Sequence, residues 1–181
     1  HMDVLQSYLK NKKFEEMEQY LSQMNKEIGP SMQLYFTGNS VADAVLSNKL
    51  FLAQNKGVQV NVVAQLPGKL MISDVQLGSV LSNLLDNAIE AQESVAEPFI
   101  NVSIRRDRGM LFMKIENSAS GLYHYKDNRL VSTKKGGDHG IGLINTVKII
   151  ESVGGVMDIQ PEMDRFTVKI LLPLTAESEV S

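Results

Sequence analysis

The sequence predicts an α/β protein: a two-layer α/β sandwich whose mixed sheet is covered by helices on one face, preceded by a partial helical hairpin. Apolar residues recur at helical spacing in three segments beyond residue 37, and segments of strand-like alternation lie between and after them. The resulting order (helix, strand, helix, strand, strand, helix, strand, strand) suits helices packed on one face of a sheet. The content of 43% hydrophobic and 22% charged residues is that of an ordinary globular protein.

The bulk properties limit the classes of function. A chain of 181 residues can form one domain with a sizeable core plus an appendage. The net charge of −3 does not favour binding to nucleic acid or to an anionic membrane. The absence of cysteine excludes disulfides and thiolate metal sites. No apolar run approaches the roughly 20 residues of a membrane span, and no signal-peptide pattern is visible.

The N-terminal part has the pattern of a helical hairpin. Residues 3–10 resemble the end of a helix, a turn is expected at 11–12, and a second helix is expected over 13–28. The apolar residues of this second helix follow a heptad, with steps of three and four: Phe14, Met17, Leu21, Met24 and Ile28. Two interpretations remain open. The helix packs on the main domain, or the hairpin pairs with a second copy as a four-helix bundle.

These signals set the expected domain organisation. We expect a truncated helical hairpin over residues 1–28 and a connector over 29–36, which begins with the helix-breaking pair Gly29-Pro30. The connector should end in a short strand at 34–36. The main domain should span 37–174, and a polar tail should follow over 175–181.

The first half of the main domain should contain two helices around a strand. Asn39-Ser40 can cap a helix over 41–55, which Gly57 ends, and 58–65 alternates as a strand does. After a turn at Pro67-Gly68, Ser73-Asp74 caps a long helix that runs to about Val95.

The second half should add two hairpins and a helix. Strands are expected at 99–106 and 110–116, around a turn at 107–109. Residues 118–138 form a polar segment without clear periodicity, the kind of long loop that is often functional. A helix then runs to Gly154-Gly155, and strands at 156–159 and 166–172 close the sheet.

Two asparagines mark the long helix as a candidate site. Its apolar residues define one buried face, and Asn83 and Asn87, four residues apart, project from one side of the helix. Asparagine is unfavourable inside a helix because its amide competes for backbone groups. The pair is either two surface amides or two neutral oxygen donors for a hard cation and the phosphates that it carries.

A glycine-rich segment precedes the next helix and forms a second candidate. In GGDHGIGL (136–143), Gly140 and Gly142 lead into an amphipathic helix. Glycines at a helix N-terminus let backbone N–H groups approach phosphate, which the helix dipole also favours. The spacing fits neither the dinucleotide fingerprint nor a P-loop, so a nucleotide site here would be of another kind.

Three motifs together resemble the GHKL ATPase superfamily, which includes gyrase, heat-shock chaperone ATPases, MutL and histidine kinases. LLDNAIEA (84–91) resembles its N box, IENSASGL (115–122) its adenine box, and HGIGL (139–143) its second glycine box. The resemblance covers about residues 5–173 and implies the Bergerat fold. Within the superfamily, the chain is most similar to Agr-type peptide quorum-sensing sensor kinases of Gram-positive bacteria.

The resemblance implies roles for the two asparagines. Asn87 matches the asparagine that binds Mg²⁺ together with phosphate oxygens and water. Asn83 lies where ATP-hydrolysing members carry a glutamate that activates water. An amide cannot act as a general base near neutral pH, although it could contact phosphate or metal-bound water. This favours a kinase over a hydrolase.

The remaining candidates also come from the resemblance. Asn117 lies where the adenine-binding aspartate is usual and is otherwise a turn residue at a strand end; Gly121 matches the second glycine of that box, and Ala119 replaces the first. Phosphate contacts are expected from the backbone of the second glycine box and from the polar segment before it. This set comprises Lys134, His139, Gly140, Gly142 and Leu143. Either Lys134 or Lys135 would neutralise the phosphates, or the lysine is simply solvated. His139 alternatively supports the loop.

The resemblance predicts the ATP-binding catalytic domain of a two-component sensor histidine kinase. With ATP and Mg²⁺ it would transfer the γ-phosphoryl group to a histidine and then to a response regulator in quorum sensing. The alternatives are a hydrolysing conformational clamp, MutL-like or chaperone-like, and a nucleotide-binding dimerisation module without catalysis. No histidine occurs between Met2 and Ile28, so we expect the chain to begin downstream of the acceptor histidine. The full-length protein should form a homodimer through the hairpin, and this part should be its cytoplasmic domain, attached to the cell membrane only through a missing N-terminal sensor region.

Overall fold

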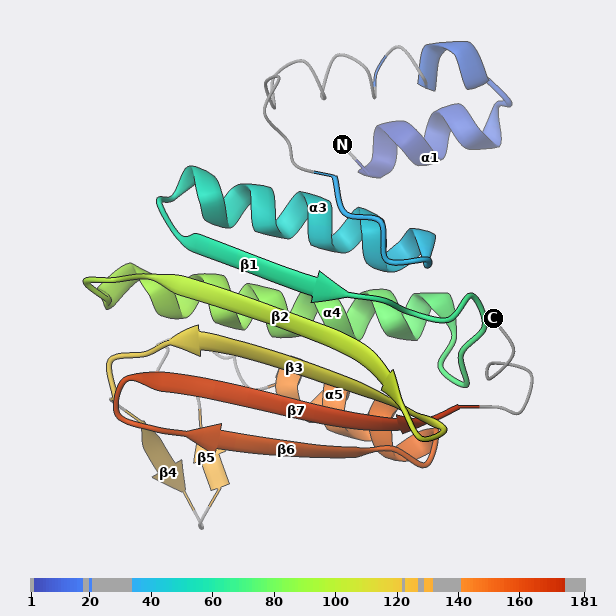
Figure 1. The fold of residues 1–181 in the computed structure, drawn as a ribbon. Helices are drawn as coiled ribbons and strands as arrows, with labels where there is room; N and C mark the ends of the chain where they lie inside the picture. Colours follow the sequence, from blue (N-terminus) through green and yellow to red (C-terminus); the bar gives the residue numbers. More distant parts are fainter. Residues whose placement is uncertain are drawn as a thin grey trace. The chain divides into compact units, whose positions relative to one another are not determined.

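The computed structural model describes residues 2–17, 20, 34–121, 123–126, 129–131 and 141–174 (Figure 1). The chain forms two compact units, residues 1–33 and residues 34–181, which are described separately below. No helix in these described ranges is long and apolar enough to cross a membrane.

The smaller unit begins with helix α1 (Met2–Lys10), followed by the expected turn at 11–12. Helical residues follow at 14–17, and the rings of Tyr8 and Tyr20 meet edge to face with their centroids 6.1 Å apart. Of the heptad positions, Phe14 is exposed and Met17 is half-buried. Positions 21, 24 and 28 lie outside the described residues, so the interpretation as a dimerising hairpin stays a prediction.

The larger unit is built on a mixed sheet with the strand order β1-β2-β3-β7-β6. β1 pairs with β2 in parallel, and every other neighbouring pair of this sheet is antiparallel. The strands are β1 (Gln59–Ala64), β2 (Phe99–Asp107), β3 (Met110–Ser118), β6 (Val156–Pro161) and β7 (Arg165–Pro173). The β2–β3 hairpin turns through Arg108 and Gly109, both at positive φ (48° and 76°), the turn that matches the twist of the strands.

Three helices cover one face of this sheet (Figure 1). They are α3 (Ser40–Asn55), α4 (Asp74–Glu90) and α5 (Ile141–Ser152), and the 3₁₀ helix η1 (Ala91–Ser94) follows α4 directly. Between the layers, apolar side chains of the helices pack on the inward residues of the strands, such as Leu46, Leu81, Ile104 and Ile170. The prediction of a two-layer α/β sandwich is therefore confirmed.

The predicted helix starts are confirmed with their caps. Asn39 Oδ1 accepts from the backbone N–H groups of Val41 and Ala42 at 3.1 and 3.0 Å. Ser73 and Gln76 form a capping box at the start of α4. The predicted end of this helix was wrong, because α4 gives way to η1 after Glu90.

The expected strand at 34–36 was also wrong. The segment is irregular, because side chains of α3 bind its backbone in place of a neighbouring strand. Ser47 Oγ accepts from the N–H of Tyr35 at 3.1 Å, and Asp43 Oδ1 accepts from the N–H of Thr37 at 2.7 Å. The segment thus lies along α3 as a connector.

The polar segment 118–138 contains structure that its sequence did not predict. β4 (His124–Lys126) and β5 (Arg129–Val131) pair as a separate two-stranded antiparallel sheet. Residues 132–138 lie outside the described part of the chain. The interpretation of the whole segment as an irregular loop was wrong where these strands lie.

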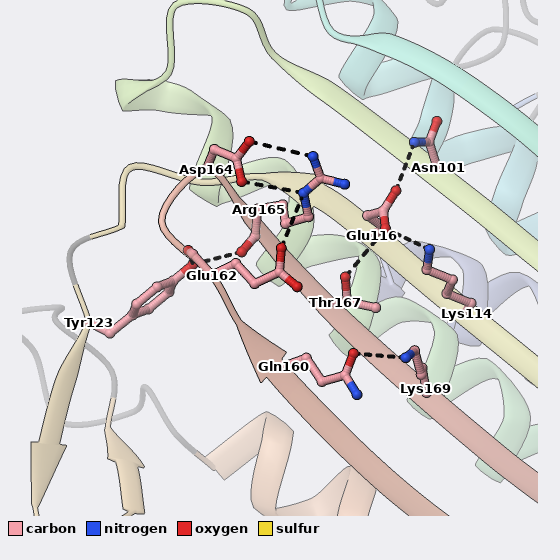
Figure 2. Close-up of polar contacts among 10 residues, drawn as sticks. All are labelled: Asn101, Lys114, Glu116, Tyr123, Gln160, Glu162, Asp164, Arg165, Thr167 and Lys169. Carbon is pink, nitrogen blue, oxygen red and sulfur yellow. Dashed lines mark hydrogen bonds and ion pairs between the residues drawn. The ribbon is translucent and has the colours of Figure 1, made fainter.

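The outer face of the main sheet carries a row of polar side chains across neighbouring strands (Figure 2). Asn61 donates to Asn101 Oδ1 at 3.1 Å, and Asn101 donates to Glu116 Oε1 at 3.3 Å. Thr167 donates to Glu116 Oε2 at 3.4 Å, and Lys114 Nζ lies 2.6 Å from the same oxygen. The hydrogen bond from Lys114 is the largest cause that holds the pKa of Glu116 below its ordinary value.

Replacement of Lys114 should therefore change how stability depends on pH. A lowered carboxyl pKa gives stability that is present above the unfolded-state pKa and lost as pH falls through the folded-state pKa. Lys114→Met should lower the free energy of unfolding at pH 7 by less than about 1 kcal/mol, since the pair is partly exposed. The loss should shrink as pH falls below the ordinary pKa of a glutamate, about 4.3, as urea denaturation across a pH series would measure.

Lys169→Met is the matched control. Lys169 lies opposite Lys114 in the register of β3 and β7, and its Nζ binds the neutral Gln160 Oε1 at 2.8 Å (Figure 2). Lys169→Met should lower the free energy of unfolding by the same amount across the pH series. A loss for Lys114→Met that does not vary with pH would contradict the assignment.

Candidate functional site

Helix α4 presents its two asparagines away from its buried face. Seven of its residues are buried against the sheet and the other helices: Leu77, Val80, Leu81, Leu84, Leu85, Ala88 and Ile89. Asn83 is half-buried and Asn87 is exposed. Their spacing of four residues places them about one helical turn, or roughly 5–6 Å, apart on one side of α4.

Asn83 joins α4 to the first turn of α5. Its Nδ2 donates to the carbonyl oxygen of Gly142 at 3.3 Å and lies 3.5 Å from Thr146 Oγ1. Thr146 is completely buried, and its hydroxyl donates to the same Gly142 oxygen at 2.8 Å. The structure thus brings the asparagine-bearing helix and the glycine-rich segment together, although Asn83 and Gly142 are 59 positions apart in the sequence. Sequence reasoning did not select Thr146, which stands out there only as a polar residue among apolar ones.

Gly142 lies where a side chain would meet little of the protein itself. The nearest neighbours of a Cβ at this position would be atoms of the Asn83 side chain, at ordinary contact distances of 3.4–3.7 Å. Its φ lies outside the left-handed region. The fold therefore does not require glycine here, whereas a ligand close to the backbone would. Leu143, next along α5, is half-buried.

Gly121, in contrast, is required by the fold. Its φ is +71°, and a Cβ there would lie 2.6 Å from the carbonyl oxygen of Met163. The N–H of the nearby Ala119 donates to the carbonyl of Asp164 at 2.9 Å, so the segment after β3 packs closely on the turn between β6 and β7. Contact of Gly121 with a nucleotide stays a prediction.

Tyr123 also binds the segment after β3 to the turn between β6 and β7 (Figure 2). Its hydroxyl lies 2.8 Å from the carbonyl oxygen of Glu162 and 3.1 Å from that of Arg165. Sequence reasoning did not select Tyr123, since an isolated tyrosine in a polar segment has no distinctive pattern. The start of the segment between Ser118 and β4 is therefore held at a fixed place beside the sheet.

Asn117 lies at the end of β3 and is 3% exposed. Its Nδ2 donates to the carbonyl oxygen of Ser118 at 2.8 Å. Of the other predicted contacts, Lys134, His139 and Gly140 lie outside the described residues.

The described residues around Asn83 and Asn87 offer few protein ligands for a metal ion. No group of three or more His, Cys, Asp or Glu side chains within the described ranges could hold a metal ion. A cation bound by Asn87 would take most of its oxygen ligands from phosphate and water, the usual situation for Mg²⁺ with a nucleotide.

Comparison with known proteins identifies the family and the fold. The sequence profile of the GHKL domain family matches residues 72–173, and no curated protein matches the chain. Among solved structures, the catalytic domain of histidine kinase ThkA is 20% identical with a TM-score of 0.61, covering 81% of this chain and 99% of that one. The mycobacterial sensor histidine kinase MprB is 18% identical with a TM-score of 0.55, covering 72% and 93%. Acinetobacter baumannii histidine kinase AdeS is 16% identical with a TM-score of 0.56, covering 96% and 95%.

Gly142→Ala tests whether a ligand approaches the first turn of α5. Without ligand, the variant should be as stable as the wild type or more stable by up to about 1 kcal/mol, because alanine is the better helix former. Its affinity for Mg-ATP should fall at least about tenfold, which corresponds to roughly 1.4 kcal/mol. Thermal unfolding and titration calorimetry would measure the two effects.

Gly121→Ala provides the contrast. It should destabilise the ligand-free chain by about 1–3 kcal/mol, because the new Cβ meets backbone in a strained conformation. If Gly142→Ala bound Mg-ATP as well as the wild type, no phosphate would lie against this turn.

Proposed function

This chain belongs to the GHKL domain family, and from that premise we propose that it is the ATP-binding catalytic domain of a two-component sensor histidine kinase. The observation that supports the proposal most strongly is the hydrogen bond from Asn83 to the Gly142 carbonyl. This bond holds Gly142, a residue of the second glycine box, beside α4. Its larger unit also has the fold of histidine kinase catalytic domains.

The residues present fit Mg-ATP. Gly142 places no side chain in the first turn of α5, and N–H groups at a helix N-terminus are suited to phosphate. Asn87, on the same side of α4 as Asn83, offers an amide oxygen to the cation. When bound, Mg-ATP supplies the phosphoryl group. The protein contributes mainly position and electrostatic stabilisation.

Transfer to histidine is favoured over hydrolysis by the identity of residue 83. A general base must accept a proton from water, and a neutral amide does not do so near pH 7. The nitrogen of Asn83 is already bonded to Gly142 and Thr146 within the protein. A clamp driven by ATP hydrolysis would need a carboxylate at this place.

We further propose the finer assignments that the sequence resemblance implies. The parent protein would be an Agr-type quorum-sensing kinase that passes the phosphate to a response regulator. The N-terminal unit would belong to its dimerising hairpin, and this part of the chain would be the cytoplasmic domain of a membrane protein. Lys134, His139, Gly140 and Leu143 would complete the phosphate-binding segment.

A transfer assay tests the proposal directly. The chain, incubated with Mg-ATP labelled on the γ-phosphate and a separate hairpin that carries an acceptor histidine, should label the hairpin with acid-labile, base-stable phosphate. The chain alone should remain unlabelled, because its N-terminal helices lack histidine. Steady hydrolysis without transfer would support the clamp, and binding without either reaction would support the binding module.

Asn87→Ala tests the proposed metal ligand. Asn87 is exposed and alanine favours the helix, so the variant should fold normally. Mg²⁺-dependent ATP binding and transfer should both be lost, because the amide oxygen is removed. The control is Asn48→Ala, the same change at an exposed position of α3, which should leave binding and transfer intact. Normal transfer by a folded Asn87→Ala variant would refute the role.

A further inference from the structure

Three polar side chains form a buried cluster where the end of α4 meets the end of β3. Asn117 and Ser118 are each 3% exposed, and Gln92, in η1, is 7% exposed. Burial of polar groups to this degree is costly unless each group is hydrogen-bonded. The cluster therefore has a defined bonding pattern, and this pattern determines what each side chain offers to a ligand.

Gln92 ties the two elements together. Its Nε2 donates to the carbonyl of Ala88, in the last turns of α4, at 2.7 Å and to the carbonyl of Ser118 at 3.1 Å. Ser118 Oγ donates to Gln92 Oε1 and accepts from the N–H of Phe99 at 2.9 Å. These bonds hold the Ser118 peptide in one orientation relative to α4.

The Ser118 carbonyl in turn orients the carboxamide of Asn117. Asn117 Nδ2 lies 2.8 Å from this oxygen and donates to it. In the flipped orientation Asn117 would place its own oxygen there, and two acceptors would face each other at that distance. The bonding pattern therefore fixes which end of the carboxamide points away.

The other end, Oδ1, is open to a ligand. It accepts no hydrogen bond within the described part of the chain. Every fully enclosed side-chain nitrogen or oxygen among the residues that the structure describes has a partner. Oδ1 is therefore not fully enclosed, so the side chain presents one neutral acceptor at the surface.

We infer that Gln92 and Ser118 are positioning residues for base recognition: they hold Asn117 so that only its Oδ1 faces the ligand, and the base selected carries a hydrogen-bond donor, as the 6-amino group of adenine does. The inference rests on the proposed ATP site. It also states that this neighbourhood requires a carboxamide at position 117. A carboxylate has no N–H for the Ser118 carbonyl and would place a charge where the residue is almost fully buried.

Asn117→Asp tests this requirement. Burial and the facing carbonyl oxygen should raise the pKa of the introduced carboxyl in the folded state, so stability should fall as pH rises. Without nucleotide, the thermal midpoint should lie several degrees below that of the wild type at pH 8, and the difference should shrink toward about pH 4.5. ATP affinity at pH 8 should fall severalfold.

Asn48→Asp is the matched control, the same change at an exposed position of α3. Its midpoint should follow the wild type across this pH range. An Asn117→Asp variant that is as stable as the wild type and binds ATP more tightly would overturn the inference, because a carboxylate would then be the better acceptor.

Gln92→Met supplies a second test, which remains valid even if the Asn117→Asp variant does not fold. Methionine has a similar length and removes the bonds to Ala88 and Ser118. The readout is the ratio of the affinities for ATP and inosine triphosphate, which carries an oxygen in place of the 6-amino group. The wild type should prefer ATP at least about tenfold. Gln92→Met should narrow this preference severalfold, whereas an equal loss for both nucleotides would show a merely structural role and overturn the inference.

Failure of the proposed function would be recognisable separately. A wild-type chain that binds neither nucleotide would refute the ATP site. The pH dependence of the nucleotide-free Asn117→Asp variant would still decide whether a carboxamide is required at position 117.

Discussion

The burial of one face of α4 is the constraint on which the rest of the site depends. Its seven apolar residues are enclosed between the sheet and the other helices, so the helix cannot rotate without exposing them. This fixes the direction in which Asn83 and Asn87 project. Polar bonds then connect neighbouring elements to α4: Lys49 of α3 to Asp86 at 2.6 Å, the Gly142 carbonyl to Asn83, and Ser118 of β3 through Gln92. The apolar face orients the helix, and these polar contacts determine which parts of the chain lie beside it.

The glycines of the two glycine-bearing motifs serve different physical purposes. Gly121 has a positive φ and lies against the backbone of Met163, so any side chain would strain the fold. Gly142 has neither restriction, since a Cβ there would meet the side chain of Asn83 only at ordinary contact distances. The sequence motifs do not distinguish these two glycines. Their surroundings in the structure do: the fold requires a glycine at 121, whereas at 142 only a bound phosphate would require one.

Local patterns in the sequence predicted most of the fold, because burial along one face leaves a periodic signal. The starts of α3 and α4, the β2–β3 turn and the closing hairpin follow from caps, glycines and alternation. The predictions were wrong where contacts with residues distant in the sequence determine the local conformation. The segment at 34–36 is irregular because α3 binds its backbone, and α4 ends before the predicted residue, where Gln92 reaches across to β3. For the site, the candidate asparagines could be selected from spacing and resemblance, but Thr146 and Gln92 could not, since their partners lie far away in the sequence or on another element.

Two asparagines that the sequence resemblance places at acidic motif positions share one structural feature. By that resemblance, Asn83 lies where ATP-hydrolysing members carry a glutamate, and Asn117 lies where an adenine-binding aspartate is usual. In both, the amide nitrogen donates to a backbone carbonyl, that of Gly142 and that of Ser118. A carboxylate accepts but does not donate, so it would leave each carbonyl facing a second acceptor. At residue 83 an amide also avoids a negative charge near the place proposed for a polyphosphate, where it would repel the ligand. The two amides thus support the packing of Gly142 against α4 and the orientation of Asn117. Under the proposed function, Asn83 also supplies no general base for hydrolysis. If the chain is a kinase, the bonding of Gly142 and the lack of a general base would have a common origin in the amide of Asn83.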